Sequence, residues 1–170
     1  MSRPSHFAAA LLLGTAILAP PFLPARAQTA PAGHPAQGVT VSQAWSRATA
    51  PGGRNGAVFF TIHNTGAADT LVGASAPVAE KTELHETIND NGMMRMRPVP
   101  AVKIDQGKSV TFAPGGLHVM LLGLKAPLQQ GAHFPVTLTF QKAGAVTVEA
   151  VVQGPGATTP GMMHGTMGRH

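Results

Sequence analysis

The feature that most constrains the fold is a regular change between short runs of β-forming residues and turn residues. Such a run recurs about every 8 to 15 residues between positions 38 and 152. The runs are 39–45, 56–64, 70–74, 81–88, 93–99, 109–112, 117–124, 135–141 and 145–152. No window keeps an apolar period of 3.6 residues over three turns, and the 20 Gly and 15 Pro also disfavour helices. The pattern predicts an all-β fold, an antiparallel sandwich or a barrel.

The first 27 residues have the features of a secretory signal peptide. Arg3 precedes an apolar run over 7–18, and Ala25-Arg26-Ala27 supplies the small residues of a cleavage site, so the mature chain is expected to begin at Gln28. The apolar run is shorter than the ~20 residues that a membrane-spanning helix needs. We therefore expect an exported protein whose mature form has no membrane span.

The rest of the chain divides into three parts. Residues 28–37 are small and Pro-containing and predict a flexible leader, whereas 38–153 holds the β-forming runs and predicts the folded domain. Residues 154–170 have too few bulky apolar residues for a strand and predict a flexible tail. The densest group of metal-ligand side chains in the chain lies in this tail: Met162, Met163, His164, Met167 and His170.

Composition then excludes several classes of protein. The chain has no Cys beside eight His and eight Met, so disulfide scaffolds, iron–sulfur proteins, thiol oxidoreductases and thiolate zinc sites are excluded. A blue-copper electron carrier is excluded for the same reason, because its site needs a thiolate. Loss of Arg3 and Arg26 with the signal peptide lowers the formal charge from +5 to +3. No cluster of Lys and Arg remains, so nucleic-acid binding is not expected.

Four residues of the predicted strands form a candidate metal site: His85, Met96, His118 and Met120. His118 and Met120 are two apart on one strand and therefore share a face. A turn at 89–92 would join 81–88 and 93–99 into a hairpin that brings His85 near Met96. Two imidazoles and two thioethers without a carboxylate favour Cu(I) over Zn²⁺, Ca²⁺ or Mg²⁺. The alternative is that these Met residues are ordinary packing in a plain adhesion or interaction sandwich.

The spacing His-x10-Met-x21-His-x-Met resembles the signature of the periplasmic PCu(A)C-type copper chaperones. The resemblance extends over roughly 38–152 and includes the segments 44–51, 55–64, 83–86 and 114–121. It implies a cupredoxin-like, Greek-key β-sandwich in the periplasm that holds one Cu(I) with His85, Met96, His118 and Met120. It also implies delivery of copper to the CuA centre of cytochrome c oxidase subunit II, alongside a thioredoxin-fold partner. The tail over 162–170 resembles the extension with which some members bind a second copper as Cu(II).

One alternative function stays open, and several other residues are expected to have ordinary structural roles. A periplasmic copper storage or resistance protein of the CopC type is the alternative, and in neither reading is the chain an enzyme. We expect Trp45 to anchor the core, and His63 and His133 to be structural or at the surface. Glu83 and Glu86 are expected to be solvated charges, one of which could support His85, while Met93 and Met94 are spare thioethers or edge packing.

Overall fold

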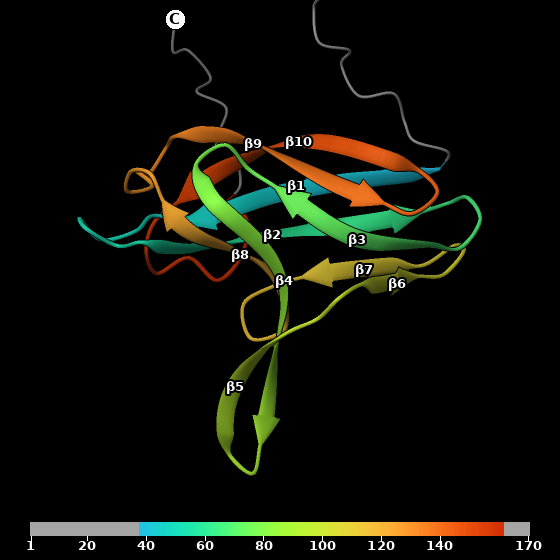
Figure 1. Cartoon of the computed structure of the whole chain (residues 1–170), viewed down its shortest axis with the longest axis horizontal. Helices are drawn as coiled ribbons and strands as arrows, with labels where there is room; N and C mark the ends of the chain where they lie inside the picture. Colours follow the sequence, from blue (N-terminus) through green and yellow to red (C-terminus); the bar gives the residue numbers. More distant parts are fainter. Residues whose placement is uncertain (1–37, 162–170) are drawn as a thin grey trace, which may run out of the picture. The chain divides into compact units, whose positions relative to one another are not determined.

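The structure is a computed structural model that describes residues 38–161, and within them every regular element is a β-strand (Figure 1). The predicted signal peptide, the predicted leader and the His/Met residues of the tail at 162–170 lie outside the described residues. Within the described part of the chain, no helix is long and apolar enough to cross a membrane.

Ten strands make up the domain. They are β1 (Val39–Arg47), β2 (Asn55–Asn64), β3 (Asp69–Ser75), β4 (Ala79–Asp90), β5 (Met93–Pro98), β6 (Val102–Ile104), β7 (Ser109–Phe112), β8 (Leu117–Leu124), β9 (His133–Phe140) and β10 (Gly144–Gln153). All nine predicted strands are confirmed, most of them within one or two residues. Strand β6 was not predicted, because three residues are too short a run to show an alternating pattern.

The strands form one hydrogen-bonded sheet in the order β5-β4-β8-β2-β1-β10-β9-β3-β6. Strand β7 lies off this path and pairs with β2, which also pairs with β8. Every pairing is antiparallel except β1 with β10. The sheet folds over itself, because Phe60 of β2 and Leu138 of β9 belong to a single hydrophobic core although their strands are separated in the sheet by β1 and β10. The predicted cupredoxin-like β-sandwich is therefore confirmed, with one parallel pairing added.

A bulge in β1 changes which way that strand presents its side chains. Before the bulge, Val39 faces the core; Gln43 then adopts a left-handed backbone (φ 54°), and the register against β2 shifts by one residue. Because neighbouring side chains alternate between faces, the extra residue turns Trp45 and Arg47 to the outer face of the sheet. Trp45 is buried, as predicted, but it lies outside the core and packs on Phe59 instead.

Strands β4 and β5 form a hairpin that projects from the sandwich (Figure 1). Its two-residue turn is Asn91-Gly92, and both residues have positive φ (51° and 86°), the signature of a type I′ turn. Asn89 Oδ1 accepts a hydrogen bond from the Gly92 N–H at 2.8 Å and closes the turn. The turn fixes the register, which pairs Thr87 with Met96.

Candidate metal centre

The four predicted ligands lie on one face of three adjacent strands. His85 of β4 is directly opposite His118 of β8, and Glu83 is opposite Met120. On the other side of β4, His85 is paired with Pro98 of β5, so Met96 lies two residues along the same face. The structure thus brings the three strands together, with Met96 of β5 and Met120 of β8 each diagonal to His85 of β4 at about 7 to 8 Å between backbones.

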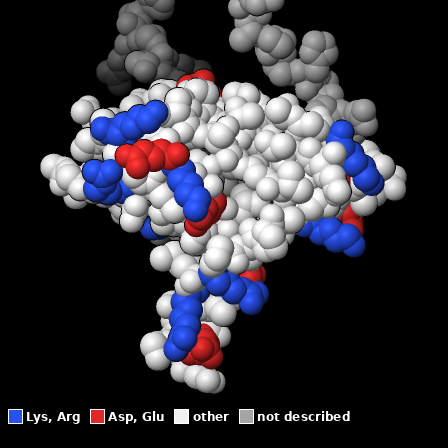
Figure 2. Space-filling model, viewed as in Figure 1, with Lys and Arg blue, Asp and Glu red and all other residues white. Residues whose placement is uncertain are grey.

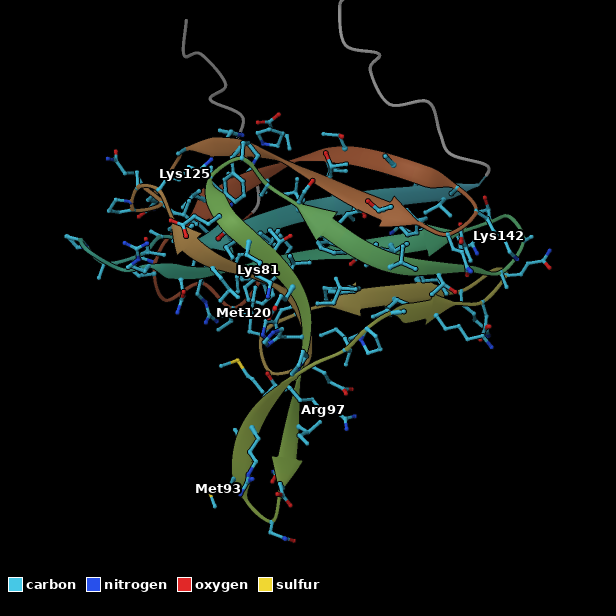
Figure 3. The ribbon with its side chains drawn as sticks, in the orientation of Figure 1. Lys81, Met93, Arg97, Met120, Lys125 and Lys142 are labelled. Atoms are coloured by element: carbon cyan, nitrogen blue, oxygen red, sulfur yellow. The ribbon has the colours of Figure 1, made fainter. Side chains whose placement is uncertain are left out.

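Three of the four line one cavity of about 360 Å³: Met96, His118 and Met120. Arg47 and Phe59 also line it, and Arg47 comes from the part of β1 that follows the bulge. His85 is not among the lining residues, but its ring centroid is 5.9 Å from that of His118. The predicted ligands differ in their exposure to solvent: His118 is buried (4% exposed), whereas Met96 is at the surface (62% exposed). Figure 3 shows Met120 where the hairpin joins the sandwich, with Met93 at the far end of the hairpin.

A turn before β8 fixes the imidazole of His118. Pro114 and Gly115 (φ 84°) occupy positions typical of the centre of a type II turn, which requires glycine at the second place. The turn presents the carbonyl of Gly116, which accepts a hydrogen bond from His118 Nδ1 at 3.0 Å. Nδ1 therefore carries the proton, and the lone pair of Nε2 is available to a metal ion. Burial lowers the pKa of His118 below its ordinary value, and the proximity of His85 lowers it further, whereas the hydrogen bond to the Gly116 carbonyl acts in the opposite direction. The lowered pKa favours the neutral ring, the form that binds a metal ion.

Glu83 orients the second imidazole. His85 Nε2 donates to Glu83 Oε2 at 2.9 Å, and Lys81 Nζ lies 2.6 Å from Glu83 Oε1. The bonds from Lys81 and His85 lower the pKa of the Glu83 carboxyl, so it is ionised. His85 Nδ1 is then the nitrogen with a free lone pair, and it is buried without a hydrogen-bond partner among the described residues. A buried, unpartnered imidazole nitrogen is costly unless it meets a ligand such as a metal ion.

The sequence did not predict a row of aromatic rings that lies next to His118. Trp45 contacts Phe59 at 4.7 Å between ring centroids, and Phe59 lies 6.4 Å from His118. The guanidinium of Arg47 covers Phe59 at 5.8 Å, while Arg47 Nε donates to the carbonyl of Ala157 at 2.6 Å. The bulge that moves Trp45 and Arg47 to this face leaves no reliable signal in the sequence, although both residues lie in the segment that carried the resemblance.

The donor set suits a soft ion. Two imidazole nitrogens and two thioethers are the kind of donors that Cu(I) prefers. Among residues 38–161, no group of three or more His, Asp and Glu is placed to hold a metal ion. The two other histidines within residues 38–161 lie elsewhere: His63 bonds the hydroxyls of Ser42 (3.1 Å) and Ser109 (2.8 Å), and His133 is exposed on β9.

Comparison with known proteins identifies the family of this domain. A family model with the description "Putative lipoprotein LpqE-like" matches residues 39–152. The chain belongs to the LpqE-like family. One relative, "Putative lipoprotein Lxx21020" of Leifsonia xyli subsp. xyli, is 41% identical over 147 residues, which are 85% of this chain and 86% of the relative.

Solved structures of PCuAC domains have the same fold. The copper-bound PCuAC domain from PmoF2 is 26% identical, with a TM-score of 0.60 over 69% of this chain and 94% of that domain. The solution structure of CuI-DR1885 from Deinococcus radiodurans is 31% identical, with a TM-score of 0.54 over 75% of this chain and 81% of that protein. The predicted membership of the PCu(A)C-type copper chaperone family is confirmed.

Proposed function

We propose that this protein is a copper chaperone that binds Cu(I) on the β4–β5–β8 face and passes it on by ligand exchange. The observation that carries the proposal is the pair of oriented imidazoles: each histidine has one nitrogen held by a hydrogen bond and one left free. Two methionines lie beside them on the same face. Relatives whose names describe copper-bound PCuAC domains support copper as the cargo.

In this proposal His85, Met96, His118 and Met120 are the Cu(I) ligands. Neutral thioethers hold Cu(I) less strongly than thiolates, so an acceptor with cysteine ligands takes the ion down a gradient of affinity. The cavity of about 360 Å³ is much larger than one ion and leaves room for an incoming ligand of the acceptor. No bond of a substrate is made or broken, so we propose that the protein is not an enzyme.

Export and delivery to a partner complete the proposed function. We propose export to the periplasm with cleavage after Ala27; the lipoprotein names of the family and of its relative support export. The proposed acceptor is the CuA centre of cytochrome c oxidase subunit II, with a thioredoxin-fold protein as a partner that keeps the acceptor thiols reduced. We further propose that Met162, Met163, His164, Met167 and His170 bind a second copper as Cu(II).

Competition against a Cu(I) chelator under reducing conditions tests the ligand set. Met120→Leu keeps the side-chain volume and removes the thioether, and His118→Ala with Met120→Ala removes two ligands. We expect the double variant to weaken Cu(I) binding at least about 100-fold, because losing even a hydrogen-bond partner of a ligand costs about 10- to 100-fold. The matched control is Met93→Ala with His133→Ala, which removes the same residue types from exposed positions. Tight binding by the folded double variant would refute the assignment.

Two further measurements separate the parts of the proposal. Mixing the copper-loaded protein with a reduced apo CuA domain should transfer Cu(I), whereas a storage protein of the CopC type would keep it. Removing 162–170 should lower Cu(II) stoichiometry by one and leave Cu(I) binding unchanged. Equal Cu(II) stoichiometry in both chains would contradict the second site.

A further inference from the structure

Strand β5 exposes apolar side chains to an unusual degree. All six of its residues are exposed, and among the described residues four large hydrophobic side chains are exposed, three of them on this strand. These are Met93 (62%), Met94 (60%) and Met96 (62%). Exposed apolar groups gathered on one short projecting element indicate a function other than packing.

The register separates these methionines into two faces. Met94 is opposite Asn89 and Met96 is opposite Thr87, so both point to the face that carries His85. Met93 is opposite Asp90 and points to the other face, because it is one residue away. Met93 and Met94 are therefore neighbours with nearly equal exposure on opposite faces of one hairpin.

Met96 connects the interior of the site with the surface. It lines the cavity together with His118 and Met120, yet more than half of its side chain is exposed. Met94 is the next residue outward on the same face, about 6.7 Å further along the strand. Two flexible thioether side chains at this spacing are able to contact one soft ion between them.

The two faces of the hairpin also differ in charge. On the back face Arg95 pairs with Asp90 at 3.4 Å and Arg97 pairs with Glu86 at 2.9 Å, and Figure 2 shows acidic and basic side chains close together on the hairpin. On the front face the residues opposite the methionines are uncharged Thr87 and Asn89. The front face thus offers Cu(I) two soft donors free of flanking arginines.

We propose that Met94 is a transfer ligand, which binds Cu(I) together with Met96 as the ion leaves or enters the inner site. The inference rests on the proposed Cu(I) function. On departure the bonds to His85, His118 and Met120 break while the bond to Met96 persists, and a bond to Met94 Sδ forms. A thiol of the acceptor then binds the ion, loses its proton to water and displaces both thioethers. Copper stays Cu(I) throughout, so no electron is transferred.

A transfer ligand changes rates and leaves the equilibrium affinity alone. In the full-length protein we would compare Met94→Leu with Met93→Leu, the matched control from the opposite face. Stopped-flow transfer of Cu(I) to a synthetic peptide with two cysteines should be five- to tenfold slower for Met94→Leu, equivalent to about 1 kcal/mol of barrier. The Kd for the first Cu(I) should stay within twofold of the wild type, and Met93→Leu should match the wild type in both measurements.

Ag(I), a soft ion of the same charge, gives a direct readout. With ¹³C-labelled methionine methyl groups, Ag(I) added beyond one equivalent should shift the Met94 resonance before that of Met93. Equal transfer rates for the two leucine variants, or equal shifts of the two methyl groups, would overturn the proposal. A large rise in Kd for Met94→Leu would also overturn it, because Met94 would then be a resident ligand. Failure of the wild type to bind Cu(I) would instead refute the proposed function, and this inference with it.

Discussion

Asp69→Asn tests how a single buried carboxylate secures the end of the sandwich that is formed by β3, β9 and β10. Asp69 is 4% exposed at the start of β3. Its Oδ1 accepts the backbone N–H groups of Thr70 (2.7 Å) and Lys142 (2.9 Å), and its Oδ2 accepts that of Ala143 (2.8 Å). The carboxylate thereby holds the turn between β9 and β10 against β3.

The magnitude follows from these bonds. A hydrogen bond to a charged group contributes about 1.5 to 3 kcal/mol, and asparagine keeps one oxygen but turns an NH₂ group toward the Ala143 N–H. We expect Asp69→Asn to lower the free energy of unfolding by about 2 to 3 kcal/mol at pH 7. For a domain of this size the melting temperature should fall by roughly 10 °C. Urea unfolding followed by circular dichroism measures the difference.

The pH dependence identifies the charge as the cause. Burial alone would raise the pKa of Asp69, but the backbone bonds from Thr70, Ala143 and Lys142 outweigh it and lower the pKa below its ordinary value of 3.8. The folded state then binds fewer protons than the unfolded state, so this stabilisation is complete above about pH 4 and is lost as the pH falls through the folded pKa. The gap between wild type and Asp69→Asn should close over that range, whereas exposed Asp105→Asn should change little at any pH. A gap that stays constant into strong acid would refute the reasoning.

Three further substitutions have definite expected outcomes. Phe60→Ala removes a ring that is 1% exposed and stacked on Phe112 at 4.4 Å, and it should cost about 3 to 5 kcal/mol in urea unfolding. Gly115→Ala forces a Cβ into a left-handed position (φ 84°), so it should cost about 1 to 2 kcal/mol and, by moving the Gly116 carbonyl, weaken Cu(I) binding in chelator competition. Gln43→Gly removes the backbone strain of a non-glycine residue in the left-handed conformation at the β1 bulge, so it should raise the melting temperature by a few degrees. A lower melting temperature would show that the Gln43 side chain has a stabilising role of its own.

Much of the fold was predictable because local signals agreed with one another. Alternation located nine of the ten strands, and Asn91-Gly92 specified both the hairpin and its type I′ turn. The spacing of His118 and Met120 placed them on one face with no reference to other strands. The run over 102–104 was missed because three residues give no period, although Val102 and Ile104 are buried.

Other features depend on contacts between distant segments. Nothing in the sequence distinguishes Asp69 from other carboxylates near turns, because two of its three donors come from the turn at Lys142 and Ala143, more than 70 residues later. Glu83 was one of two equal candidates to support His85, and the structure places Glu83 on the imidazole while Glu86 pairs with Arg97 on the opposite face. Alternation along β4 explains the difference once the direction of His85 is known.

The sequence by itself therefore determined the strands, the turns and a set of soft donors without cysteine. The tertiary structure decided how the donors are arranged: β8 pairs with β4 so that His85 meets His118, and each ring keeps one nitrogen free. It also decided, through the bulge at Gln43, that Trp45 and Arg47 lie beside the site and outside the core. Periodicity along one strand fixes which residues share a face, but which strands become neighbours, and where one added residue reverses a face, depends on packing across the whole sheet.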